Sequence, residues 1–295
     1  MPAIGFVGFG EAGSSIAGGL RAAGVERVLA YDIATNSPDR GDLIRSRAAK
    51  SGTSLTGSSS DLVEASDIVL STVTSSSSLE AARQTARFLH SRHLYADLNS
   101  VSPALKREIG GVIAKTGARF VEAAVMAPVP PYGHRVPMLL GGDGAEAFID
   151  TMAPLGMRMQ RLPGDVGTAA AVKMCRSIVV KGLEALLCEC VLGAVPYGAA
   201  SHVFASLRES YPGLDWQKLA DYTMGRVVVH GERRAREMEE VADTLRAIGV
   251  EPIMAEATTR RQEWSARLDL KSHFGPDGPA TYAEVLEVLA KIARG

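Results

Sequence analysis

A glycine-rich turn near the start of the chain has the residue types and the spacing to hold a phosphate group. An apolar run, residues 4–7, leads into the sequence Gly8-Phe9-Gly10-Glu11-Ala12-Gly13, and a segment with helical spacing follows. In such a unit the first glycine permits a tight turn, the second lets the backbone approach a pyrophosphate, and the third lets the helix pack on the strand. The helix N-terminus adds free N–H groups and a positive dipole end. We therefore predict a dinucleotide site at residues 8–13; the alternative is a glycine-rich turn in another α/β fold.

A carboxylate follows this turn at a distance typical of a dinucleotide site. The apolar run of residues 28–31 ends on Asp32, nineteen residues after Gly13. A carboxylate there can accept hydrogen bonds from the adenosine ribose hydroxyls of NAD and would repel the 2′-phosphate of NADP. NAD is therefore favoured over NADP. Arg40, Arg45 and Arg47 lie further along the chain and keep recognition of a phosphate open.

A lysine in the second half of the chain is a candidate general base. Lys173 lies near the start of an apolar stretch from about residue 165 to residue 195, and Ser177 and Lys181 follow at intervals of one helical turn. Burial lowers the pKa of a lysine, and such a lysine can take a proton from an alcohol or return one to a carbonyl. The alternative is a structural lysine that pairs with Glu184 or Glu189, or one that reaches the surface.

The elements that must hold these residues alternate between strands and helices up to about residue 163. Strands are expected at residues 4–7, 28–31, 67–73, 94–98, 118–125, 136–140 and 157–162. Strand–helix alternation predicts an α/β Rossmann domain with a mostly parallel sheet over residues 1–163. The long helix then joins it to an all-α C-terminal domain, residues 164–295. In that domain Ala235, Met238, Ala242, Leu245 and Ile248 trace one amphipathic face.

Composition excludes several classes of protein. The chain has 295 residues and a formal net charge of −1, with 46% hydrophobic and 22% charged residues. This balance argues against nucleic-acid partners, and the longest apolar runs are too short to span a bilayer. We expect a cytoplasmic protein without a signal peptide. Cys188 and Cys190 would face different sides of a helix, so we expect no metal site.

Several segments, in chain order, resemble those of the β-hydroxyacid dehydrogenase family, which is related to phosphogluconate dehydrogenase. They are residues 8–13, the sequence Asp97-Leu98-Asn99-Ser100-Val101-Ser102-Pro103, residues 122–127, and Gly164-x-x-Gly167 followed by Lys173. The resemblance implies a Rossmann domain, a long interdomain helix and an all-helical domain, often in a dimer. It also implies that residues 97–103 lie near nicotinamide, that residues 122–127 form the substrate loop, and that Lys173 is the general acid/base.

The chain departs from the family pattern on the substrate side. The serine of the family's substrate loop is Met126 here, and its two glycines are Ala127 and Pro128, of which Pro128 has no N–H to donate. The asparagine four residues after the lysine is Ser177. The C-terminal half resembles a divergent branch with a phosphogluconate-dehydrogenase-like C-terminal domain. In it the basic residues of the segment 230–238 either bind an anionic substrate or form a solvated helix face.

We therefore expect an NAD(P)-dependent oxidoreductase that oxidises a secondary or primary alcohol, such as a β-hydroxy acid, or reduces the matching carbonyl. The alternatives are an imine reductase or an oxidative decarboxylase on the same fold, and a non-catalytic NAD-binding sensor. The partners would be a small alcohol or carbonyl and a second copy of the chain, with no nucleic acid and no membrane.

The expected cofactor residues are Gly8, Phe9, Gly10, Glu11, Ala12, Gly13, Asp32, Thr72, Val73, Thr74 and Asn99. The expected substrate residues are Ser100, Val125, Met126, Ala127 and Arg236, and the catalytic residues are Lys173 and Ser177.

Overall fold

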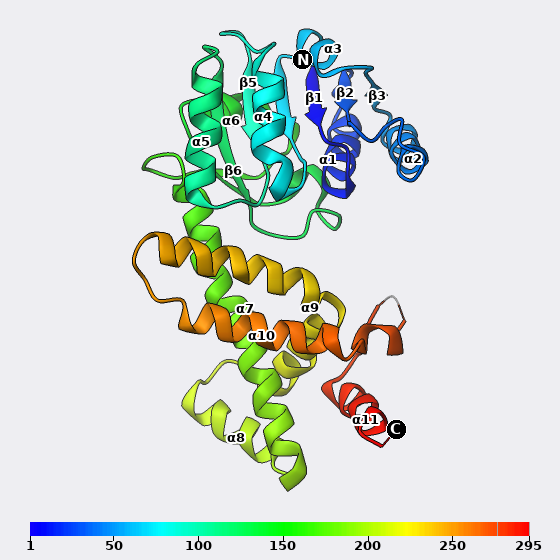
Figure 1. Ribbon diagram of the computed structural model, residues 1–295, viewed down its shortest axis with the longest axis vertical. Coiled ribbons are helices and arrows are strands. Elements are labelled where there is room, and N and C mark those ends of the chain that lie inside the picture. Colours follow the sequence, from blue (N-terminus) through cyan, green and yellow to red (C-terminus); the bar gives the residue numbers. More distant parts are fainter. Residues whose placement is uncertain (276, 295) are drawn as a thin grey trace. The chain divides into compact units, whose positions relative to one another are not determined.

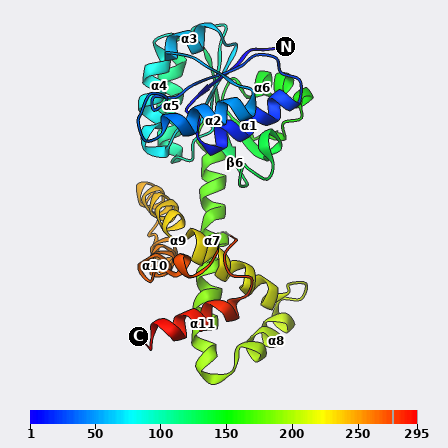
Figure 2. The same ribbon diagram turned by 90° about the vertical axis from the view of Figure 1, so that its right-hand side faces the viewer.

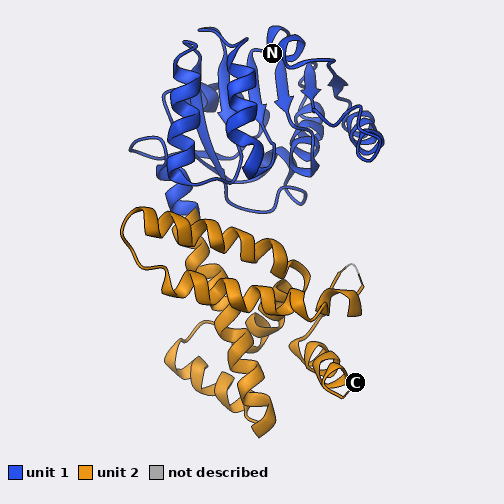
Figure 3. Cartoon of the chain, in the orientation of Figure 1, with its two compact units in different colours: residues 1–173 blue, residues 174–295 orange. Residues whose placement is uncertain are grey.

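The chain forms two compact units. A computed structural model describes residues 1–275 and 277–294. Residues 1–173 form the first unit and residues 174–295 the second, so the division falls inside the long helix α7 (Thr168–Ala194) (Figure 3). The sequence suggests a change of domain near residue 164, slightly before this helix begins.

The first unit is built on an eight-stranded sheet with the order β3-β2-β1-β4-β5-β6-β7-β8 (Figure 1). All pairs from β3 to β6 are parallel, β7 runs antiparallel to β6, and β8 runs parallel to β7. This confirms the predicted mostly parallel Rossmann-type sheet. The two-residue edge strand β3 was not predicted, since so short a strand carries almost no pattern. The strands are β1 (Ile4–Val7), β2 (Val28–Tyr31), β3 (Ser54–Leu55), β4 (Ile68–Ser71), β5 (Leu94–Asp97), β6 (Arg119–Val125), β7 (Met138–Gly141) and β8 (Met159–Arg161).

Helices cover both faces of this sheet (Figure 2). Helices α1, α2 and α6 contribute to one core cluster, and α3, α4 and α5 to the other. Side chains of one strand alternate between them: Leu94 and Ala96 pack in the first cluster and Tyr95 in the second. Burial on both faces explains why the strands read as continuous apolar runs. The helices are α1 (Glu11–Ala22), α2 (Gly41–Ser51), α3 (Ser59–Glu64), α4 (Ser78–Ala86), α5 (Pro103–Ala114) and α6 (Ala145–Met152).

A buried ion pair anchors the loop that follows β5. Lys106 of α5 and Asp97 at the end of β5 each expose about 1% of their side chains, and Lys106 Nζ lies 3.4 Å from Asp97 Oδ2. The same ammonium donates a hydrogen bond of 2.7 Å to the backbone oxygen of Asp97. Because a buried charge is costly without a partner, this pair couples α5 to the carboxyl end of β5.

The second unit is entirely helical, as predicted. Besides its part of α7 it contains α8 (Ala200–Ser210), α9 (Trp216–Ala247), α10 (Ile253–Arg267) and α11 (Tyr282–Ile292). Helices α9 and α10 lie side by side (Figures 1 and 2), and a Cβ atom at Gly231 of α9 would lie 2.5 Å from the backbone oxygen of Gln262 of α10. Within the ranges that the structure describes, we find no helix with the length and hydropathy of a membrane-spanning segment.

One predicted core residue of this unit is on the surface. Ala235, Met238 and Ala242 are buried along α9, as expected from their spacing. Ile248 was expected on the same face, but its side chain is 69% exposed. The helix ends at Ala247, so the helical spacing no longer applies to Ile248.

Candidate functional site

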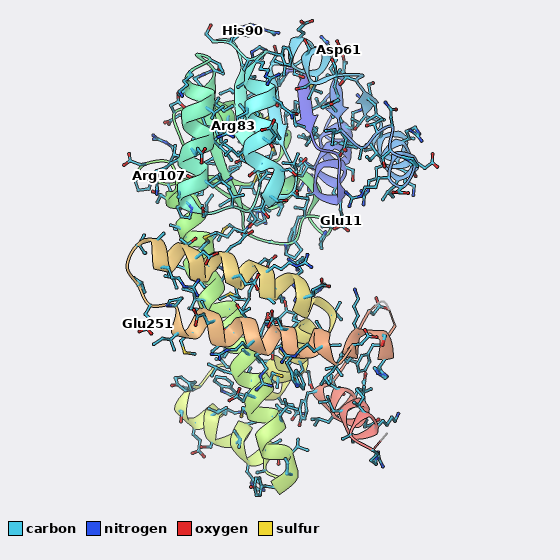
Figure 4. All side chains as sticks on the ribbon, in the orientation of Figure 1. Glu11, Asp61, Arg83, His90, Arg107 and Glu251 are labelled. Carbon is cyan, nitrogen blue, oxygen red and sulfur yellow. The ribbon has the colours of Figure 1, made fainter. Side chains whose placement is uncertain are left out.

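The glycine-rich turn joins β1 to α1 with the geometry that its residue types predict. Gly8 has a φ of +83°, and a Cβ atom there would lie 2.6 Å from a methyl group of Val73. Gly10 is the residue before α1, and a Cβ atom there would meet no protein atom within 4 Å. Helix α1 begins at Glu11, which is labelled in Figure 4. Because no protein atom lies near the Cβ position of Gly10, the space next to the first turn of α1 is open.

The third glycine lets the first residue after β4 pack against the turn. Thr72 Oγ1 donates a hydrogen bond of 2.7 Å to the backbone oxygen of Gly8. A Cβ atom at Gly13 would lie 2.6 Å from this hydroxyl and 3.0 Å from the same backbone oxygen. Gly13 is thus required for the contact that holds the β1 and β4 loops together.

Asp32 is bound to the same turn by its side chain. Its Oδ2 accepts a hydrogen bond of 2.7 Å from the backbone N–H of Phe9, and its Oδ1 accepts one of 2.9 Å from the N–H of Ala34. Both bonds orient the carboxylate at the end of β2. A cavity of about 680 Å³ opens beside it, a size typical of small-molecule sites.

The cavity is lined by the ends of β1 and β2, the start of α1, the loop after β4, and helices α2 and α4. From the expected cofactor residues it includes Gly8, Phe9, Gly10, Glu11, Ala12, Asp32, Thr72, Val73 and Thr74. It also includes residues that sequence reasoning did not assign, among them Leu43, Glu80 and Gln84. No local sequence motif marks these three residues. They reach the cavity through the tertiary packing of α2 and α4. Arg40 and Arg47 line it too, whereas Arg45 bonds to Asp42 and to the backbone of Thr35.

Asn99 lies at the carboxyl edge of the same sheet, but it is not among the residues that line this cavity. Its Nδ2 donates a hydrogen bond of 2.9 Å to Ser71 Oγ at the end of β4, and its backbone N–H donates one to Asp97 Oδ1. Its Oδ1 is buried, without a hydrogen-bond partner in the described part of the chain. Next to it, Ser100 is exposed.

The segment expected to form the substrate loop begins inside β6. Val125 ends this strand, and Val125, Met126 and Ala127 are all half-buried. The Met126 N–H donates a hydrogen bond of 2.9 Å to the backbone oxygen of Pro137, which continues the pairing of β6 with β7. Glu122, at the start of the segment, is fully buried, and its side chain bonds to the beginning of α7.

Lys173, Ser177 and Lys181 follow one another at intervals of four residues along α7, and thus on one face of the helix. In the second unit Lys181 Nζ lies 2.8 Å from the Glu237 carboxylate and 3.3 Å from Ser177 Oγ. Burial lowers the pKa of Lys181, although the Glu237 charge opposes this change. Lys173 and Ser177 are half-buried.

The three arginines of the segment 230–238 in α9, Arg233, Arg234 and Arg236, all form ion pairs with carboxylates. Arg234 lies 2.8 Å from the buried Glu184 of α7, and Arg233 forms an ion pair with Glu237. Arg236, the expected substrate residue, is 74% exposed and lies 2.6 Å from Glu232 on the preceding turn. Burial, together with the arginines around it, lowers the pKa of His230 to about 4.

Two protein-family models match parts of the chain. Residues 3–146 match the family described as the NAD binding domain of 6-phosphogluconate dehydrogenase, and residues 194–265 match a domain of unknown function, DUF1932. A solved conserved hypothetical protein from Sinorhizobium meliloti is 36% identical with a TM-score of 0.83, and the match covers 99% of this chain and 96% of that protein.

Two further relatives connect the chain to hydroxyacid dehydrogenases. A conserved protein of unknown function, reported to be structurally similar to 3-hydroxyacid dehydrogenases, is 32% identical with a TM-score of 0.76, over 91% of this chain and 99% of that one. The mitochondrial 3-hydroxyisobutyrate dehydrogenase of Drosophila melanogaster is 28% identical over 72% of this chain and 64% of its own length.

The chain belongs to the 3-hydroxyacid dehydrogenase-like family. This 3-hydroxyacid dehydrogenase-like protein is a divergent member, with an NAD(P)-type nucleotide-binding domain and a C-terminal part in which the matched domain has no assigned function.

The residues of the first unit fit a dinucleotide. The space next to Gly10 admits a pyrophosphate to the α1 N-terminus, where free N–H groups and the helix dipole stabilise negative charge. Asp32 offers oxygen acceptors at the end of β2, where the ribose of a bound dinucleotide lies in this fold. The unpartnered Asn99 Oδ1 adds a buried acceptor at the same edge of the sheet.

We predict that Gly10→Ala weakens NADH binding at least about tenfold, which is roughly 1.4 kcal/mol. The added methyl group would enter the space next to the α1 N-terminus without touching protein, and Gly10 has a φ of −74° that alanine adopts readily. The free energy of unfolding should therefore stay close to that of the wild type.

Gly111→Ala in α5 is the matched control, because a Cβ atom there also meets no atom within 4 Å. Titration of NADH fluorescence and chemical denaturation of both variants check the prediction. An unchanged NADH affinity in Gly10→Ala would show that the dinucleotide does not approach this turn.

Proposed function

We propose that this protein is an NAD-dependent dehydrogenase that acts on the CH–OH group of a small hydroxy acid, or reduces the matching carbonyl. The observation that carries the proposal is the combination of a dinucleotide cavity in the first unit with Lys173 on α7. The sequence similarity to a 3-hydroxyisobutyrate dehydrogenase supports a 3-hydroxy acid as the substrate class. A small molecule would thus be the natural partner of the site.

Bound NAD supplies the acceptor for the hydride that leaves the carbinol carbon. Lys173 accepts the hydroxyl proton in the oxidation and returns it in the reduction, as a positioned general acid/base does. Ser177, one turn further along α7, contributes a hydroxyl group that can hydrogen-bond the substrate oxygen or orient the lysine.

The chain's own departures from the family bear on the substrate. Met126 presents a thioether where the family has a serine hydroxyl, and Pro128 lacks a backbone donor. We propose that Ser100, Val125, Met126 and Ala127 shape the substrate pocket and that it is less polar than in relatives with the serine. Arg236 stays a predicted substrate residue, and contact with a substrate would require it to leave Glu232.

Substituting Lys173 by alanine should lower turnover by at least about a hundredfold and leave NADH affinity unchanged, since a general acid/base contributes on the order of 10²–10⁴ in rate. The assay is NADH production by the full-length protein with a panel of hydroxy acids, sugar acids and aryl alcohols. Arg176→Ala is the control, because Arg176 is an exposed cation of the same helix.

Retained turnover in Lys173→Ala would refute the assignment of the lysine. Lys181, the buried lysine two turns further on, would then be the next candidate, and Lys181→Met would test it. Tight NADH binding without turnover on any substrate would favour the non-catalytic sensor.

The choice of cofactor depends on Asp32. Its two oxygens each accept a backbone N–H, so the carboxylate is held in place at the end of β2. A fixed negative charge there repels a 2′-phosphate and accepts a ribose hydroxyl, which supports NAD. Arg40 and Arg47 line the same cavity and provide the opposing charge that NADP would need.

We expect Asp32→Asn to weaken NADH binding about tenfold, because the charged acceptor for the ribose hydroxyl becomes a neutral amide. The same variant should bind NADPH more tightly than the wild type does, since the repulsion is removed. Asp42→Asn is the control, because the Asp42 side chain is 94% exposed and pairs with Arg45. Direct titration of both reduced cofactors measures the effect. If the wild-type protein prefers NADPH, the assignment of NAD is wrong.

Two other reactions on this fold need different residues or steps. Imine reductases of similar fold typically replace the lysine, so Lys173 argues against that activity. Oxidative decarboxylation begins with the same oxidation and differs in the loss of carbon dioxide, which product analysis in the same assay detects.

We further propose that the protein is a homodimer. Val172, Val179 and Leu186 of α7 follow one another every seven residues and are 41%, 70% and 57% exposed. Side chains seven residues apart lie on one face of a helix, and such an apolar stripe is typical of helix–helix contacts between subunits.

Sedimentation equilibrium should give the mass of two chains. Leu186→Glu should shift it toward that of one chain, and Glu189→Gln on the same helix should not.

A further inference from the structure

Helix α7 begins without an N-cap side chain of its own. The residue before its first turn is Gly167, which has a φ of +106°. A Cβ atom there would lie 3.0 Å from the backbone oxygen of Pro103 and 2.8 Å from a guanidinium nitrogen of Arg107 (labelled in Figure 4), both of α5. A residue with a capping side chain therefore does not fit, and the first N–H groups of α7 need another acceptor.

Glu122 of β6 provides this acceptor from a distant part of the chain. Its Oε2 accepts a hydrogen bond of 2.7 Å from the N–H of Gly167, and its Oε1 accepts one of 2.8 Å from the N–H of Ala170. The residue is fully buried, and a Cβ atom at Gly141 of β7 would lie 2.9 Å from Oε2. The carboxylate thus lies close against β7, and both of its oxygens accept hydrogen bonds from the start of α7.

We propose that Glu122 is a positioning residue, which fixes the first turn of α7 to the sheet and thereby fixes the orientation of Lys173. The inference rests on the proposed function in that it takes Lys173 as the acid/base. Lys173 is three residues after Ala170, so it lies one turn beyond the bonded N–H. Side chains of a helix lean toward its N-terminus, so the position of this first turn bears on where the Lys173 amine lies.

A carboxylate such as that of Glu122 is well suited to hold the N-terminus of a helix. A carboxylate at a helix N-terminus interacts favourably with the helix dipole, and its hydrogen bonds to N–H groups are charge-assisted. Two such bonds from one rigid group restrain both the rotation and the translation of the helix end. Without them the first turn would fray, since helix ends open more readily than helix centres.

The experiment compares Glu122→Gln with the full-length wild type. Glutamine has the same shape, but it carries no charge and presents one acceptor where the helix needs two. Glu146→Gln is the matched control, because Glu146 of α6 is an exposed carboxylate of the same unit that pairs with Arg161. Three quantities are measured: amide hydrogen exchange of residues 167–172, the rate at which an acylating reagent labels the Lys173 amine, and kcat with KM.

In Glu122→Gln we expect the amides of Gly167 and Ala170 to exchange at least about tenfold faster, as the charge-assisted bonds weaken. The labelling rate of Lys173 should change about threefold or more, and kcat should fall about tenfold to a hundredfold, since small misplacements of a catalytic group have such effects. The NADH dissociation constant should not change, because Glu122 does not line the nucleotide cavity. Glu122→Asp, which keeps the charge with a shorter reach, should give values between those of wild type and Glu122→Gln.

Unchanged amide exchange and unchanged Lys173 labelling in Glu122→Gln would overturn the proposal. A change in both with an unchanged kcat would also overturn it, because Glu122 would then be structural only. If Lys173→Ala retains turnover, the proposed function fails, while exchange and labelling still decide whether Glu122 orients the lysine. If Glu122→Gln does not fold, Gly141→Ala displaces the carboxylate with its new methyl group and should change the same quantities in the same direction.

Discussion

A buried carboxylate at the start of α7 connects the two parts of the candidate chemistry. Glu122 belongs to β6, and β6 belongs to the sheet whose other strands carry the nucleotide cavity. Helix α7 carries Lys173 and then continues into the second unit. A hydrogen-bonded link therefore joins the first turn of the helix that carries Lys173 to the sheet. The first unit contains both the lining of the cavity and Lys173.

The arrangement of the sheet explains why residues far apart in sequence meet. In a parallel sheet all strands end at the same edge, and the loops that follow them converge there. The order β2-β1-β4 brings Asp32, the glycine-rich turn and Thr72 together, and the bonds from Phe9 to Asp32 and from Thr72 to Gly8 join the three loops. Asn99 follows at the next strand and bonds to Ser71 of β4.

The features predicted from sequence are those that short segments determine. The glycine-rich turn, the strands, the long helix and the helical second unit follow from local spacing and apolar runs. Other features depend on tertiary contacts between distant segments. The Lys106–Asp97 pair and the Glu122 cap arise from packing across strands and helices, and no local pattern marks them. Ile248 continued the apolar spacing beyond the end of its helix, and spacing alone does not reveal where a helix stops.

Among the residues that the structure describes, those that line the nucleotide cavity all belong to the segment 7–84. Met126, Pro128 and Ser177, where the sequence departs from the family pattern that it resembles, all come later in the sequence. Mutations at these later residues do not change the side chains that line the cavity. If they hold the substrate, as we propose, selection can act on substrate binding and on nucleotide binding separately. Under the proposed function, a lineage with this architecture can change its substrate while it keeps the same nucleotide.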